Sequence, residues 1–181
     1  MARDSVFLVS PAEDHIVAAA YADSMKSKPR IRASWEQVFL GARGELAFAR
    51  FLGDRHLQYC RDHLLRQDAT ADDYRFDLPG RVDVKTTEPS NRNLVVNRVH
   101  KDVRYVLLRA TRAVTRAEDP LDLKLEVMGW SSGDKERFEP FRTDPKKSFQ
   151  LAANLSPLSS LMLELAKDIV KSNLSKRSVV L

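Results

Sequence analysis

The sequence predicts an α/β domain in which helices flank a mixed β-sheet. Three observations favour this fold class: two segments with helical spacing of apolar residues come first, strand-like runs fill the middle, and an amphipathic segment follows them. At 181 residues the chain suits a single domain covering residues 1–181. We expect an N-terminal helical extension over residues 1–33, a core over about 34–130, and a loop with a closing helix over 131–181.

Two helices are predicted before the strands. The first covers residues 11–27, with an apolar face made of Ile16, Ala19, Ala20 and Met25. Ser34 and Gln37 have the spacing of a capping box, which predicts the start of a second helix that ends at Gly53-Asp54. Gly41 and Gly44 lie inside it, each costing about 1 kcal/mol relative to alanine. Such a cost is acceptable where a helix must approach a sheet closely.

Five strands and a final helix are predicted next. The strand candidates are residues 74–78, 82–87, 94–96, 103–109 and 123–130, with a turn at Pro79-Gly80 between the first two. Residues 131–147 are rich in turn formers and predict a loop, and Pro157 opens the last helix. The buried stripe of that helix is expected to be Leu158, Leu161, Met162, Leu165, Ile169 and Val170. Trp35 and Trp130 are interpreted as core residues.

Composition narrows the class of protein. Hydrophobic residues make up 43% and charged residues 30%, which excludes a disordered tail, a collagen-like fibre or a disulfide scaffold. The single cysteine, Cys60, excludes an intrachain disulfide and a cysteine-rich zinc site. The apolar run Val6–Val9 is too short for a signal peptide, and no apolar stretch is long enough for a membrane span. We therefore expect a soluble cytoplasmic protein.

The positive charge is concentrated in one segment. Lys and Arg total 30 against 25 Asp and Glu, a net charge of +5. Residues 98–116 hold six basic residues and one acid, Asp102, so this segment alone carries that surplus. It is either a solvated strand face or a stripe that contacts phosphates, which would make DNA a partner. The basic residues are Arg98, Lys101, Arg104, Arg109, Arg112 and Arg116.

Asp83 and Lys85 are the first candidate catalytic residues. Side chains alternate along a strand, so both lie on one face about 6.6 Å apart, where the carboxylate can hold a cation and the ammonium can position a water. Two other segments share the Asp-x-Lys spacing: 144–146 has a proline at its centre, and 122–124 lies in a strand-like run. An upstream acidic cluster and a glutamate on the preceding helix favour Asp83.

The upstream acid depends on strand register. A two-residue turn at Pro79-Gly80 would put Asp72 about 13 Å from Asp83, too far for one metal ion. A loop with an odd number of residues, centred on Leu78, places Asp73 opposite Asp83, with Cβ atoms about 5 Å apart. We prefer Asp73, keep Asp72 as the register-dependent substitute, and interpret Asp77 as a turn residue.

Electrostatics favour a cation between these acids. Two carboxylates about 4 Å apart repel by about 4 kcal/mol at an effective dielectric constant of 20. Oxygen ligands suit Mg²⁺ or Mn²⁺ rather than zinc. Glu45, on the flank of the second helix, is either solvated or reaches over the sheet edge to the ion. The histidines show no paired-ligand spacing and are interpreted as surface or packing residues: His15, His56, His63 and His100.

These residues resemble the PD-(D/E)XK nuclease superfamily, which has the restriction-endonuclease-like fold. The matching pieces are GARGE at residues 41–45, DYRF at 73–76 and DVKTT at 83–87, followed by strand candidates at 101–108 and 127–130. The similarity covers about residues 35–130. The chain departs from the family pattern in having Asp72 rather than proline before Asp73, and aspartate rather than the commoner glutamate at Asp83.

The resemblance implies a Mg²⁺- or Mn²⁺-dependent endonuclease that hydrolyses DNA phosphodiester bonds. Asp73, Asp83 and the carbonyl of Val84 would hold the metal, Lys85 would orient the attacking water, and Glu45 would be an auxiliary acid. The alternatives are an inactive DNA-binding protein of the same fold and a partner-binding protein. Small nucleases of this type often form homodimers. Candidate nucleic-acid contacts are Thr86, Asn91, Arg92, Asn93, Arg98 and Lys101.

Overall fold

The computed structural model describes residues 5–28, 33–66, 77–117, 121–141, 144 and 147–177, with side chains described up to residue 171. Four helices and seven strands lie in these ranges, joined by two short 3-10 turns at Lys135–Arg137 and Ala152–Asn154. The helices are α1 (Ala12–Lys26), α2 (Trp35–Leu52), α3 (Asp54–Leu65) and α4 (Leu158–Arg177). The strands are β1 (Val6–Ser10), β2 (Val82–Thr87), β3 (Asn93–Val96), β4 (Arg104–Ala110), β5 (Leu123–Ser132), β6 (Glu139–Pro140) and β7 (Ser148–Leu151).

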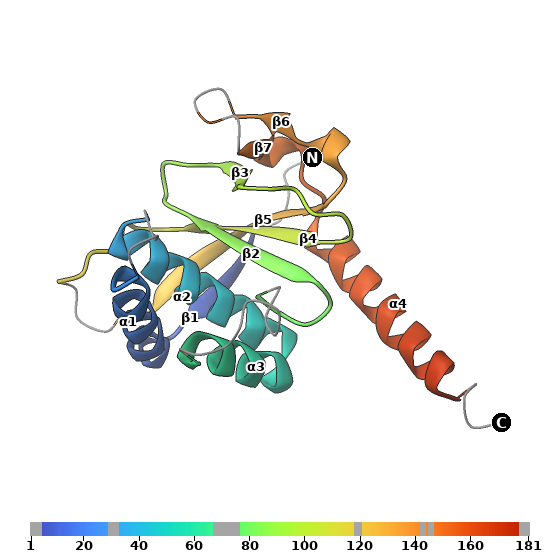
Figure 1. Cartoon of the computed structure of the whole chain (residues 1–181), viewed down its shortest axis with the longest axis horizontal. Helices are drawn as coiled ribbons and strands as arrows, with labels where there is room; N and C mark the ends of the chain where they lie inside the picture. The colour runs from blue at the N-terminus through green and yellow to red at the C-terminus, as the bar shows by residue number, and fades with distance from the viewer. Residues whose placement is uncertain are drawn as a thin grey trace.

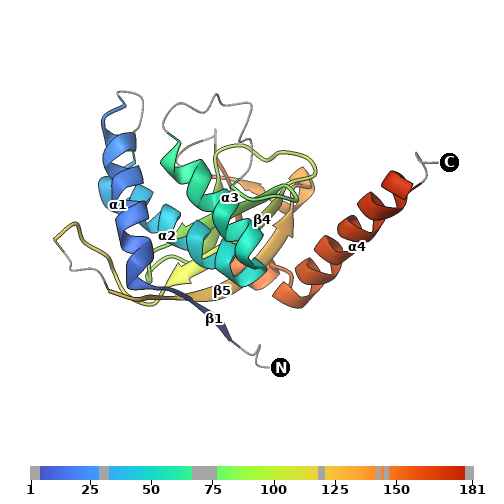
Figure 2. The same cartoon turned by 90° about the horizontal axis from the view of Figure 1, so that it is seen from below.

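The main sheet is mixed and has the strand order β1-β5-β4-β2. Strand β2 runs parallel to β4, while β5 runs antiparallel to both β4 and β1. Helices α1, α2 and α3 lie together on one side of this sheet (Figures 1 and 2). A smaller antiparallel sheet, β3-β7-β6, lies on the other side. The fold is therefore α/β with a mixed sheet flanked by helices, as the sequence predicted.

Strand β4 is buried on both faces, which explains its continuous apolar sequence. Val106 and Leu108 belong to the core between the main sheet and the helices. Tyr105 and Leu107 belong to a second core, which the main sheet shares with β3 and the loops around it. Strand β2, by contrast, lies at the end of this sheet among the described residues: Val82 and Val84 are buried against the helices, while Asp83 and Lys85 on the other face are partly exposed.

Helix α2 begins with the predicted capping box. The Ser34 hydroxyl accepts from the Gln37 amide at 3.1 Å, and the Gln37 side chain accepts from the Ser34 amide at 3.0 Å. Gly44 lies directly on β2: a Cβ atom there would be 1.8 Å from Thr86 Oγ1. At Gly41 a Cβ would meet nothing within 4 Å. The close-approach interpretation therefore holds for Gly44 and is wrong for Gly41.

The N-terminal segment differs from the sequence prediction. Residues 6–10 form strand β1, which pairs with β5 at the sheet edge, and α1 packs against α2. The predicted apolar face of α1 is only partly confirmed: Ala19 packs against the core, but Ile16 is 70% exposed and Ala20 is also exposed. The buried face carries Ala18 and Ala22, whose small side chains let α1 approach α2, together with the ion-paired Asp14. A further helix, α3, was not predicted.

Helix α4 leaves the body of the molecule, so its predicted buried stripe is mostly wrong (Figure 2). Of that stripe only Leu161 is buried, two residues are partly buried, and Met162, Ile169 and Val170 are exposed. The base of α4 is held to the sheet by Trp130 Nε1, which donates to Ser160 Oγ at 2.9 Å. Arg104 of β4 adds an ion pair with Asp168 at 2.6 Å.

The strand predictions are confirmed for 82–87, and within one or two residues for β3, β4 and β5. The predicted loop at 131–147 contains the short strand β6. Residues 74–76 of the first strand candidate lie outside the described residues. Both tryptophans are buried, as predicted. Within the described ranges, no helix has the length and apolar character needed to cross a bilayer.

Candidate active site

The turn before β2 determines which acid faces Asp83. Leu78 and Val82 pair through two backbone hydrogen bonds of 3.1 and 3.4 Å, which leaves a three-residue loop between them. Gly80 and Arg81 in this loop have φ values of 80° and 56°. The loop has an odd number of residues, as expected, but it is centred on Gly80 rather than on Leu78. The register therefore puts Asp77 opposite Asp83.

Asp77, predicted from the sequence to be a turn residue, lies in the candidate site. Its Oδ2 accepts a hydrogen bond from the backbone N–H of Val84 at 2.7 Å. Burial and the neighbouring carboxylates of Glu45 and Asp83 raise the pKa of Asp77 well above its ordinary value. The preferred ligand Asp73 and its substitute Asp72 lie outside the described residues.

Asp83 and Lys85 lie side by side, as the alternation of β2 predicted. Their carboxylate and ammonium form a direct ion pair, and the side chains are 21% and 38% exposed. Burial lowers the pKa of Lys85, but the carboxylates of Asp83 and Asp77 outweigh it and raise that pKa above its ordinary value. With no metal ion bound, Lys85 therefore stays protonated near neutral pH and can stabilise negative charge.

Glu45 reaches the same cluster from α2, one residue after the glycine that touches β2. Its Oε2 is buried and has no hydrogen-bond partner among the residues that the structure describes. Burial raises the pKa of Glu45 to about 8; the charge of Lys85 lowers it and that of Asp83 raises it further. A carboxylate oxygen in this position needs either a proton or a cation to compensate its charge.

His63 joins the cluster from α3, and sequence reasoning missed it. One ligand atom each of Glu45, His63 and Asp77 lie within 4.8 Å of one another. The three residues come from α2, from α3 and from the segment before β2, so no local spacing connects them. No sequence signal identified His63, because the helix that carries it was not predicted; the buried residues of that helix are Leu57, Cys60 and Leu64.

The described residues of the other two Asp-x-Lys pairs make other contacts. Asp122 Oδ1 accepts from the N–H of Ala12 at 2.8 Å, at the start of α1. Lys124 lies 4.0 Å over the ring of Phe7. Asp144 pairs with Lys147 at 3.6 Å. Lys146 of the third pair lies outside the described residues; among the residues that are described, Asp83 and Lys85 are the pair that lies beside a group of acids.

Comparisons with family models, curated proteins and solved structures gave no match to this chain.

A cleft opens beside Asp83 and Lys85 on the side of the small sheet. It has a volume of about 260 Å³, and Arg98, His100 and Tyr105 lie in its lining. The Tyr105 hydroxyl accepts from the His100 amide at 2.9 Å and donates to the Arg98 carbonyl at 3.2 Å. These two bonds hold the backbone of residues 98–100 against β4, which places the exposed Arg98 on the wall of the cleft that contains Asp83 and Lys85.

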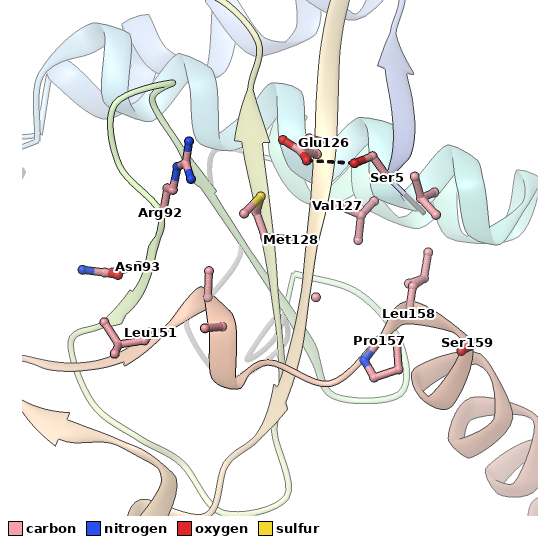
Figure 3. Close-up of a pocket in the computed structure, with 14 residues that line it drawn as sticks. Ser5, Arg92, Asn93, Glu126, Val127, Met128, Leu151, Pro157, Leu158 and Ser159 are labelled. Atoms are coloured by element: carbon pink, nitrogen blue, oxygen red, sulfur yellow. Dashed lines mark hydrogen bonds between the residues drawn. The ribbon is translucent and has the colours of Figure 1, made fainter. Parts of the chain in front are cut away.

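The remaining candidates for nucleic-acid contact lie elsewhere. The hydroxyl of Thr86 is buried under Gly44, so Thr86 only continues the strand. Arg92 and Asn93 line a separate cavity of about 890 Å³ with Met128 and Leu151 (Figure 3). Asn91 Oδ1 accepts from the Asn93 amide at 3.0 Å, and Lys101 is exposed in a turn.

The basic segment is partly neutralised within the fold. Arg104 pairs with Asp168 at 2.6 Å, Arg109 pairs with Glu126, and Arg116 pairs with Asp23 at 3.0 Å. These three arginines fasten strands and helices to one another. Of the six basic residues in the segment, Arg98 is the one that lines the cleft next to Asp83.

Proposed function

We propose that the chain is a metal-dependent endonuclease of the restriction-endonuclease-like fold that hydrolyses DNA phosphodiester bonds. The observation that carries the proposal is the convergence of Glu45, Asp77 and Asp83 around Lys85 at the edge strand β2. Lys85 supplies one positive charge where three carboxylates meet. A fold that only needed stability would gain little from such a cluster.

The donor set fits a hard divalent cation. At a separation of about 4 Å, two carboxylates repel by about 4 kcal/mol at an effective dielectric constant of 20, and a cation between them removes this cost. Glu45 also has a buried oxygen without a partner among the described residues. Asp77 and Asp83, with the carbonyl of Val84, would hold Mg²⁺ or Mn²⁺ through oxygen ligands. Asp77 takes the role that the sequence analysis gave to Asp73.

The side chains divide the work of hydrolysis. A bound divalent cation lowers the pKa of a coordinated water and polarises a phosphoryl oxygen. Lys85 keeps its proton, so it stabilises the negative charge that develops on the phosphate as water attacks. Arg98, on the same cleft wall, binds and orients the phosphate backbone. Glu45, on the helix side, lies next to the proposed metal ligand Asp77 as an auxiliary acid.

The decisive experiment is a DNA-nicking assay with purified protein in Mg²⁺ or Mn²⁺. We expect the wild type to nick or cut DNA, and Lys85→Ala to lower the rate at least 100-fold because charge stabilisation is lost. Lys124→Ala is the matched control: it removes the lysine of another Asp-x-Lys pair, which lies over Phe7 instead. A wild type that is inert on several forms of DNA would overturn the proposal.

The second candidate is a DNA-binding protein of the same fold without catalysis. The direct ion pair between Asp83 and Lys85 favours it, because this contact compensates Asp83 without a metal. In that case Asp83→Asn would leave DNA affinity unchanged in a filter-binding assay, and no nicking would be seen. Affinity that does not fall with salt would argue against both candidates, since phosphate binding releases counterions.

A further inference from the structure

Glu45, His63 and Asp77 form a group with a nitrogen ligand on the helix side of the site. One ligand atom from each lies within 4.8 Å of the others. Ligands of one cation are typically about 3–4.5 Å apart, given bond lengths of about 2.0–2.6 Å. Small rotations of these side chains therefore suffice for one ion to touch all three.

A second observation points to a ligand in this group. Glu45 Oε2 has no solvent contact and no hydrogen-bond partner within the described part of the chain. A buried carboxylate oxygen is normally satisfied by a donor or by a metal ion. The helix that carries Glu45 is fixed against the sheet by the Gly44–Thr86 contact, so Glu45 cannot move out into solvent by shifting its backbone.

We propose that Glu45, His63 and Asp77 form a cation position that binds Mn²⁺ in preference to Mg²⁺. Mg²⁺ favours oxygen ligands and keeps several waters, whereas imidazole nitrogen is a good ligand for first-row transition metals. A single histidine among carboxylates therefore lowers the relative affinity for Mg²⁺. This inference refines the metal of the proposed nuclease site and rests on that proposal only in treating the acidic cluster as a cation site.

The position shares Asp77 with the proposed hydrolytic centre but differs from it in place and chemistry. Asp83 and Lys85 line the cleft on the side of the small sheet, together with Arg98. His63 and Glu45 belong to α3 and α2, on the opposite side of the main sheet from that small sheet. Metal preference can therefore be changed through His63 without altering the residues that face the phosphate.

The test is direct metal binding, measured without DNA. Mn²⁺ is titrated into the wild type, His63→Ala and His56→Ala, followed by the paramagnetic resonance signal of free Mn²⁺, and Mg²⁺ is added in competition. We expect the wild type to prefer Mn²⁺ at least tenfold. His63→Ala should lose that preference, while Mg²⁺ affinity changes less than threefold. His56→Ala, on the same helix but lining a different cavity, should behave like the wild type.

A measurement on the unmodified protein covers the case in which His63→Ala fails to fold. Electron spin-echo modulation of bound Mn²⁺ detects a directly coordinated ¹⁴N nucleus. A nitrogen coupling in the wild type supports the proposal; Mn²⁺ bound with no such coupling, or no preference over Mg²⁺, overturns it. Nicking in Mg²⁺ without a nitrogen coupling would overturn this inference alone. A nitrogen coupling without nicking would overturn only the hydrolytic function.

Discussion

Glu45 illustrates how one residue is placed by its neighbour. The glycine before it lets α2 rest on β2, and the glutamate then projects toward Asp83 and Lys85. The result is a carboxylate whose buried oxygen has no partner among the described residues and whose pKa is raised to about 8. Such a group makes the folded state less stable at neutral pH than a neutral side chain would, a cost typical of a functional site.

This cost predicts how stability depends on pH. Because the folded pKa of Glu45 is about 8 and its ordinary value is 4.5, the folded protein retains a proton that the unfolded chain has released. Stability therefore falls as pH rises between these two values, by about 1.4 kcal/mol for each pKa unit as an upper bound. Glu45→Gln should raise the free energy of unfolding by about 2 kcal/mol or more at pH 8.5, and much less at pH 5.

Urea unfolding at the two pH values, without divalent cations, measures this difference. Glu36→Gln, at a partly exposed position in the first turn of the same helix, serves as the control and should change stability equally at both pH values. A gain for Glu45→Gln that is independent of pH would contradict the prediction.

The sequence predicts site residues that are neighbours within one element, but not those that meet through contacts between distant elements. Asp83 and Lys85 follow from the two-residue period of a strand, so their common face was predictable. Asp77 was misassigned because the sequence indicated that the loop has an odd number of residues but not which residue lies at its centre. A shift of that centre changes which aspartate lies opposite Asp83. His63 reaches the site through the packing of α3 against α2, which no local spacing encodes.

Helix α2 and strand β2 act as a unit at the element scale. Their contact at Gly44 and Thr86 leaves no space for a Cβ atom, so we expect Gly44→Ala to push the helix away from the strand. Overpacking of this kind costs about 1–3 kcal/mol or more. Gly41→Ala is the matched control in the same helix: nothing lies within 4 Å of its new methyl group, and the better helix propensity should stabilise the protein by up to about 1 kcal/mol.

Chemical denaturation of both variants separates the two effects, since backbone propensity alone would move them in the same direction. We expect the free energy of unfolding to fall for Gly44→Ala and to rise for Gly41→Ala. If Gly44→Ala were as stable as Gly41→Ala, the close contact would not position Glu45 as argued. Metal affinity of a folded Gly44→Ala protein should also fall, because the displaced helix carries Glu45 away from Asp83.

Elements were predictable where local patterns were strong. The capping box fixed the start of α2, and the run of apolar residues identified β4. Helix α3 was missed because its buried face has only three residues, Leu57, Cys60 and Leu64, among polar neighbours. For α4 the periodicity predicted a helix but not the partner of its apolar face, and most of that face is exposed.

Net charge is a poor guide to function for the molecule as a whole. The surplus of +5 equals the surplus of residues 98–116, yet Arg104, Arg109 and Arg116 pair with acids of other elements. These pairs hold β4, β5, α1 and α4 in place. The positive charge that can reach a phosphate beside Asp83 is therefore smaller than composition suggests, and it is focused at Arg98 and Lys85.

This distribution predicts the salt dependence of DNA binding. Arg98→Ala should weaken DNA binding about tenfold and reduce the slope of log affinity against log salt by about one, the effect of losing one phosphate contact. Arg92→Ala removes the same charge from the wall of the separate cavity near Met128 and should leave the slope unchanged. Filter binding across a salt series measures both. Equal slopes for the two variants would contradict the assignment of the cleft as the DNA-binding side.

The hydrogen bond from Val84 to Asp77 has a consequence for solubility. Among the described residues, strand β2 lies at the end of the main sheet, and an unpaired strand edge is a template on which another chain can add and start aggregation. The Asp77 carboxyl group accepts the hydrogen bond of the Val84 amide on that edge, so this donor is not available to another strand. The acid proposed to hold the metal thus also guards the protein against self-association through β-strands, so mutating it for biochemical assays carries a risk of precipitation.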